Sequence, residues 1–162
     1  IFDRLRAYYE DQNVAIDIYL AVMQNKSNSP LDFDRRVQAV SEFVKLDTAP
    51  ALSASNKRVG NILGKNGRGN NAFDRSLLKE SAEVVLADSL ENVMQNNLVV
   101  IAQGNYHSAL QGLAQLAKPL DQFFSEIMVM SDDDSLKNNR LALLAELEVE
   151  LGRVADISLL AH

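Results

Sequence analysis

Apolar residues recur every three or four positions along almost the whole chain, and this period constrains the fold more than any other feature of the sequence. Runs that alternate between apolar and polar residues and are bounded by turn residues, as strands would be, are scarce. Two apolar stripes are expected to face the core, Phe33, Val37, Val40 and Val44 in one helix and Leu144, Leu147, Leu151 and Val154 in another. The pattern predicts an all-α helical bundle.

The turn-forming residues divide this pattern into separate helices. Breaks are expected at 25–30, where the chain reads Asn-Lys-Ser-Asn-Ser-Pro, at the Gly/Asn-rich segment 64–71, at Gly104 and at 131–134. Pro119 is expected in the first turn of a helix, where its missing N–H costs nothing. The predicted helices span residues 1–11, 14–25, 32–46, 49–66, 75–79, 81–102, 105–116, 119–130 and 135–161.

Length and composition restrict the class of protein. With 162 residues, 47% of them hydrophobic and 23% charged, the chain is long enough to bury a core, and residues 1–162 are expected to form a single domain. The absence of cysteine excludes disulfides, thiolate zinc sites and thiol catalysis, and it favours a cytoplasmic location. No apolar run reaches the roughly 20 residues that span a bilayer, so no membrane partner is expected. A start at Ile1 without an initiator methionine indicates a fragment of a longer chain.

Charge is distributed unevenly along the sequence. The net charge of −6 alone argues against a nucleic-acid partner, but residues 1–79 carry 12 basic and 9 acidic side chains, a charge of +3. Residues 80–162 carry 4 basic and 13 acidic side chains, a charge of −9. No acid occurs from Thr48 to Phe73. Because attraction to phosphate fades within roughly 8–10 Å at physiological salt, local charge decides whether a polyanion binds.

Searches for catalytic and metal-binding residues lead to none. Apart from the terminal His162, His107 is the only histidine, and its place at a helix start is typical of a solvent-facing residue. The run Asp132–Asp134 lacks the alternate carboxylates, central Gly and terminal Glu of a calcium loop, and it precedes a helix that it can cap. Between Gly60 and Lys65 the spacing of a phosphate loop is wrong, and no strand precedes it. We therefore assign no catalytic residue and no metal ligand.

The helix expected at 49–66 carries the clearest functional pattern. At about 100° per residue, its apolar side chains fall on one side and its basic side chains on the opposite side. Leu52, Val59, Ile62 and Leu63 form the apolar side, and Lys57, Asn61 and Lys65 the opposite one, with Arg58 beside them. Arginine and asparagine can pair with base edges or phosphate, and lysine can neutralise phosphate. A surface of this kind suits the unstacked bases of an RNA loop.

Several motifs in a fixed order resemble a known family, the C-terminal anticodon-binding domain of the bacterial glycyl-tRNA synthetase beta subunit. The resemblance extends over nearly the whole chain. It rests on Asp3-Arg4-Leu5-Arg6, on Arg36–Val40 with Phe43, and on the segments Asn56–Leu63, Pro119–Phe124, Ile127–Asp133, Asn139–Leu144 and Val154–Ser158. The chain is also similar to the DALR-type anticodon-binding domain of arginyl-tRNA synthetases, but the segments 57–63 and 128–133 favour the glycyl type.

The resemblance implies a DALR-type helical bundle that recognises the anticodon of glycine tRNA. It implies that the complete enzyme ligates glycine to its tRNA with ATP and magnesium, in a heterotetramer of two alpha and two beta subunits, with the chemistry in the alpha subunit. On this interpretation the fragment itself is not catalytic, holds no cofactor and binds neither DNA nor membrane. The alternative from a different class is a helical protein-interaction domain that uses its acidic C-terminal half.

Motif matches also suggest which residues contact tRNA. Lys57, Arg58 and Asn61 are the best candidates by resemblance, and Lys65 extends their row. Weaker candidates, some of which are equally suited to structural ion pairs, are Arg68, Arg35, Arg36, Arg4, Arg6 and Arg140; for Arg140 the expected partners are the nearby aspartates. The apolar group Phe123, Phe124, Ile127, Met128 and Met130 is expected in the core rather than as a base-stacking surface.

Overall fold

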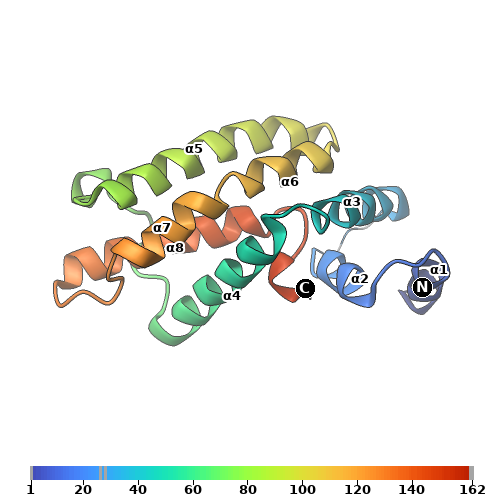
Figure 1. The fold of residues 1–162 in the computed structure, drawn as a ribbon, viewed down its shortest axis with the longest axis horizontal. Coiled ribbons are helices and arrows are strands. Elements are labelled where there is room, and N and C mark those ends of the chain that lie inside the picture. Colours follow the sequence, from blue (N-terminus) through green and yellow to red (C-terminus); the bar gives the residue numbers. More distant parts are fainter. Residues whose placement is uncertain (1, 26, 28, 161–162) are drawn as a thin grey trace.

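The computed structural model describes residues 2–25, 27 and 29–160, and all regular structure within them is helical (Figure 1). The predicted start of the first helix at residue 1, the predicted end of the last helix at residue 161, and His162 all lie outside the described residues. The all-α prediction is confirmed. Eight α-helices are described: α1 Phe2–Asp11, α2 Ile16–Met23, α3 Pro30–Phe43, α4 Ala49–Asn66, α5 Ser81–Ala102, α6 Tyr106–Ala114, α7 Ala117–Glu126 and α8 Asp134–Leu151. Two short 3-10 helices, η1 Arg75–Leu77 and η2 Ile157–Leu159, complete the regular structure.

Local sequence explains most helix boundaries. The spans predicted for α4 and α5 agree with the structure residue for residue. Helix α3 begins two residues earlier than expected because Ser29 accepts a hydrogen bond from the N–H of Asp32 and Pro30 fits the first helical position. Gly104 adopts a φ of 73°, which glycine reaches without strain, and it turns the chain from α5 into α6.

The predicted helices differ most from the structure at the C-terminal ends of α7 and α8, and α3 also ends three residues early, at Phe43 rather than at 46. Helix α7 stops at Glu126, where Ile127 takes an extended backbone conformation and the chain then bends at 129–130. Ile127 and Val129 are buried, whereas Met128 and Met130 are exposed. Met128 and Met130 thus lie outside the core, against expectation, while Phe123 is fully buried. The span predicted as 135–161 ends at Leu151, and η2 follows separately.

Helix α8 lies in the centre of the bundle, between α4 on one side and α5 on the other, while α7 bridges α4 and α5 (Figure 1). Nearly every residue from Asn139 to Leu147 is buried, which is typical of a helix surrounded by others. Both predicted stripes reach the core, except that Val44 is only partly buried. Among the described residues, no helix is long and apolar enough to cross a membrane.

A buried ion pair joins α8 to the rest of the core. The guanidinium of Arg140 lies 3.1 Å from the carboxylate of Glu83 on α5, and both residues are almost completely buried. Arg140 also donates a hydrogen bond of 2.6 Å to the backbone carbonyl of Met128. The expected pairing of Arg140 with the nearby aspartates is therefore wrong, because Arg140 points inward and the aspartates at 132–134 are exposed. Breaking such a pair leaves a buried charge, so Arg140 stabilises the fold.

Candidate nucleic-acid interface

The predicted division of α4 into two faces is confirmed. Leu52, Val59 and Leu63 are buried and Ile62 is partly buried against the core. On the other side Lys57, Asn61 and Lys65 are exposed at every fourth position, so they form a row along the helix, and Arg58 is exposed beside them. We call these four residues the α4 basic face. Lys65 lies in the last turn, where the helix dipole favours a positive charge.

Arg58 is held in place by an aromatic ring from another helix. Its guanidinium carbon lies 4.2 Å from the ring centroid of Phe124 on α7. Phe124 is partly buried and contacts Phe123 edge to face, with 5.8 Å between the ring centroids. A cation over a ring is stabilised by the ring quadrupole. The contact therefore keeps the guanidinium of Arg58 near Phe124 in the absence of a ligand.

The cations of the α4 basic face have no acidic partner. Within the described part of the chain, Lys57, Arg58 and Lys65 form neither an ion pair nor a side-chain hydrogen bond. Most other basic residues of the described chain form ion pairs. Of the two that follow Lys65 in sequence, Arg68 lies 2.7 Å from Glu148, and Arg75 contacts both Asp88 and Glu91. Three neighbouring positive charges without compensation are an electrostatic site for a polyanion.

Acids border one side of this face, which the sequence alone did not reveal. The stretch from Thr48 to Phe73 is free of acids in sequence, but a polar pocket of about 400 Å³ places Glu148 and Asp156 opposite Lys57 and Asn61. Glu148 also lies against Gly60, and it pairs with Arg68. The positive surface is therefore bounded by carboxylates on one side and by Phe124 on the other.

Most of the weaker candidates have structural partners. Arg68 donates to the carbonyl of Ala145 as well as to Glu148, and Arg6 pairs with Glu10 within α1. Arg140 is buried. Arg4 and Arg35 are exposed and form no ion pair among the described residues, but they lie on α1 and α3, outside the α4 basic face.

Arg36 belongs to a half-buried network that ties α3 to the C-terminal segment. It pairs with Asp32 at 2.9 Å, donates to the carbonyls of Arg153 and Val154, and lies over the ring of Tyr106. Burial, the largest single effect, raises the pKa of Asp32, but hydrogen bonds from Ser27, Tyr106 and Arg36 outweigh it, so the pKa is lowered. Arg36 thus holds a carboxylate within the protein rather than offering its charge to a ligand.

The histidine and aspartates that the sequence analysis did not assign to catalysis or metal binding lie at the surface or cap a helix. Asp133 caps α8 by accepting hydrogen bonds from the N–H groups of Ser135 and Leu136, as the sequence predicts. Asp134 pairs with Lys137. His107 is exposed on α6. The described residues contain no group of three or more His, Cys, Asp or Glu side chains that could hold a metal ion.

Comparison with known proteins identifies the family to which the chain belongs. A family model described as the DALR anticodon binding domain matches residues 52–156, a range that includes most of α4 and all of α8. The chain is similar to the glycine–tRNA ligase beta subunit of Marinobacter nauticus, with 49% identity over 99% of this chain and 23% of that protein. The beta subunits of Shewanella sediminis and Photobacterium profundum are 49% and 50% identical over 97% and 96% of the chain and 23% of each protein. The chain therefore spans less than a quarter of the length of these curated relatives.

Proposed function

Because the chain belongs to the family of DALR anticodon-binding domains, we propose that it binds the anticodon loop of glycine tRNA as the C-terminal domain of a glycyl-tRNA synthetase beta subunit. The observation that carries the proposal is the α4 basic face, in which Lys57, Arg58 and Lys65 are exposed, adjacent and without acidic partners among the described residues. Its similarity to glycine–tRNA ligase beta subunits supports glycine tRNA as the substrate.

Each side chain of the face has a distinct role in this proposal. Lys57 and Lys65 neutralise phosphates as point charges, which gives affinity without reading sequence. Asn61, between them, can pair with an exposed base edge. Arg58 presents a flat guanidinium whose inner side rests on Phe124, so its outer side can stack on an unpaired base or donate to its edge. Phosphate contacts thus position the loop, and Asn61 and Arg58 read it.

The domain contributes recognition rather than chemistry. We expect ATP, magnesium and glycine to be bound by the catalytic part of the complete enzyme, in the alpha subunit, with alpha and beta chains forming a heterotetramer. Placing the anticodon correctly raises the rate of aminoacylation only where the transition state depends on that placement. Loss of the contacts should therefore lower kcat/KM for the cognate tRNA and reduce discrimination against other anticodons.

Aminoacylation by the complete synthetase tests this proposal, with glycine tRNA and the same tRNA carrying a substituted anticodon. Arg58→Ala should lower kcat/KM for glycine tRNA about tenfold or more, since a base-edge or stacking contact contributes about 1–3 kcal/mol. Arg58→Lys keeps the positive charge but loses the planar guanidinium. It should therefore restore affinity for tRNA but not the discrimination between the two anticodons. The control is Lys79→Ala, because Lys79 is an exposed basic residue outside α4 that forms no ion pair among the described residues.

Equal discrimination between the two tRNAs by the wild type and by Arg58→Ala would contradict the proposal. An equal loss in Lys79→Ala would show that the effect comes from general charge rather than from this face.

A further inference from the structure

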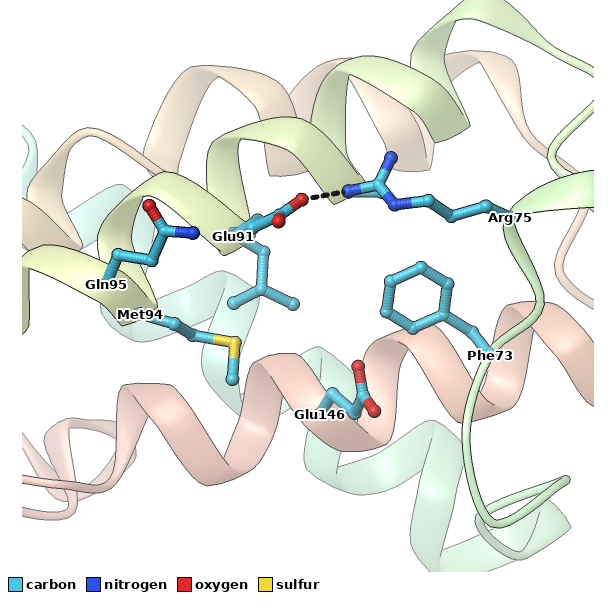
Figure 2. Close-up of a pocket in the computed structure, with 8 residues that line it drawn as sticks. Phe73, Arg75, Glu91, Met94, Gln95 and Glu146 are labelled. Carbon is cyan, nitrogen blue, oxygen red and sulfur yellow. Dashed lines mark hydrogen bonds and ion pairs between the residues drawn. The ribbon is translucent and has the colours of Figure 1, made fainter. Parts of the chain in front are cut away.

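A second surface feature lies between α5 and α8, away from α4. Phe73, Ala87, Leu90 and Met94 line a pocket of about 290 Å³, and Glu146 of α8 lies in its wall (Figure 2). Figure 2 shows Met94 and Phe73 on opposite sides of the opening, with Glu146 below them. The lining is mostly apolar, which is the usual character of a site that receives a side chain or small ligand.

Exposed apolar side chains extend this pocket along both helices. Leu98 follows Met94 by four residues on α5, so it lies on the same face, and it is 68% exposed. Val149 follows Glu146 by three residues on α8 and is 58% exposed. We call the pocket and these two residues the α5–α8 groove. Exposed apolar residues that continue an apolar pocket are typical of a docking surface for another polypeptide.

The groove also carries uncompensated negative charge. Arg75 is shared between Asp88, at 2.9 Å, and Glu91, at 2.5 Å, whereas Glu146 forms no ion pair or hydrogen bond within the described residues. Arg75 is thus already shared by two carboxylates, and Glu146 in the pocket wall is left unpaired among the described residues. Burial raises the pKa of Glu146, which shows that its charge is poorly solvated. A cation that a partner places beside this carboxylate would stabilise its charged form and so compensate for the solvation that is lost on burial.

Glu146 differs from the other acids of its helix. Asp134, Glu148 and Glu150 each pair with a basic residue of this chain. Positions 146 and 148 are about 200° apart around a helix, so Glu148 faces α4 while Glu146 faces α5. The α5–α8 groove is therefore separate from the α4 basic face, and a protein segment in the groove would leave the α4 basic face free for RNA.

We propose that the α5–α8 groove docks a segment of the remaining part of the synthetase, one that inserts an apolar side chain between Phe73 and Met94 and places a Lys or Arg on Glu146. The carboxylate of Glu146, which has no basic partner among the described residues, favours a basic segment and disfavours the phosphates of RNA. The inference rests on the proposed function in one respect: it takes the chain as part of a longer enzyme, as its relatives, of which it spans 23%, indicate.

Site-specific photo-crosslinking in the complete synthetase, without tRNA, tests the proposal. Benzoylphenylalanine is placed at Met94 or, in a second variant, at the more exposed Leu98. Both should crosslink to one region outside residues 1–162 that contains Lys or Arg near an apolar residue. The matched control is Val85, which is 43% exposed on the opposite side of α5 and should give no such product.

Charge reversal at the groove then tests the role of Glu146. Glu146→Lys should lower the crosslink yield from position 98 by about tenfold, and Glu146→Gln should lower it less. Arg58→Ala should leave the yield unchanged. Crosslinks only to a second copy of residues 1–162, crosslinks to an acidic segment, or no product from positions 94 and 98 would overturn the proposal. Crosslinking that persists while Arg58→Ala retains full anticodon discrimination would refute the proposed function and leave this inference standing.

Discussion

Replacing Lys57 and Lys65 together by alanine removes two charges from the α4 basic face without disturbing the core. Both side chains are exposed and form no ion pair or side-chain hydrogen bond among the described residues, so the change removes no such bond within the protein. Alanine also favours helix, so α4 should stay folded. Any loss of tRNA binding then reports the charges themselves.

The size of the effect follows from counterion release. Each phosphate neutralised contributes about 0.7 to the slope of log affinity against log salt for single strands, and about 0.9 for duplexes. With both lysines on phosphates, the double variant should lose about 1.4–1.8 from this slope. Between about 50 and about 200 mM salt, the affinity of the wild type should therefore fall by a factor about sevenfold to twelvefold larger than that of the double variant.

The assay is the affinity of the complete synthetase for glycine tRNA over this salt range. Lys79→Ala is the control, because Lys79 is an exposed lysine outside α4 that forms no ion pair among the described residues. The control should keep the wild-type slope. If the double variant also keeps it, or if both variants lose the same amount, the lysines of α4 do not contact phosphate and the reasoning fails.

The remaining predictions concern the fold and are measured by urea unfolding of the 162-residue chain. Arg140→Met should lower the free energy of unfolding by about 3 kcal/mol or more, because it leaves the carboxylate of Glu83 buried without its partner. Gly64→Ala should stabilise by about 0.5–1 kcal/mol, since its Cβ meets no atom within 4 Å in a helix. Gly69→Ala should instead destabilise by more than about 1 kcal/mol, because φ is +70° and a Cβ would lie 2.2 Å from a backbone oxygen of α8. Because the pKa of Asp32 is lowered in the folded state, its ionised carboxylate stabilises the fold above its ordinary pKa, and this stability is lost as the pH falls towards the folded-state pKa. Asp32→Asn should therefore lose less stability than the wild type when the pH is lowered from about 6 to about 3.

Helix α4 shows how much of the candidate site was predictable. Its boundaries and its two faces follow from local periodicity, because the side chains of one helix share a fixed geometry. The partners of that face do not follow from it. Phe124 lies 66 positions after Arg58 and Glu148 lies 80 positions after Arg68, and no local pattern indicates which distant residue will arrive beside a helix. The lack of acids in sequence therefore overstated how positive the surroundings of α4 are.

The segment after α7 shows the limit of periodicity in the fold itself. Phe123, Phe124 and Ile127 have helical spacing, and the sequence predicts that the helix continues to residue 130. In the structure, burial of both Ile127 and Val129 and the hydrogen bond from Arg140 to the carbonyl of Met128 favour an extended segment. Tertiary contacts outweigh a weak local preference here, since propensities amount to less than about 1 kcal/mol per residue.

By itself the sequence determined the all-α class, the core stripes, the limits of α4 and α5 and the identity of the exposed residues on the α4 basic face. These properties depend on neighbours within one or two helical turns, where spacing fixes direction. Only the tertiary structure decided which charges are free to act. Arg68 and Arg140 are basic residues like Lys57 and Arg58, yet carboxylates from distant parts of the chain engage them, while Glu146 has no basic partner among the described residues. Charge compensation depends on distances between helices, which the order of residues does not contain.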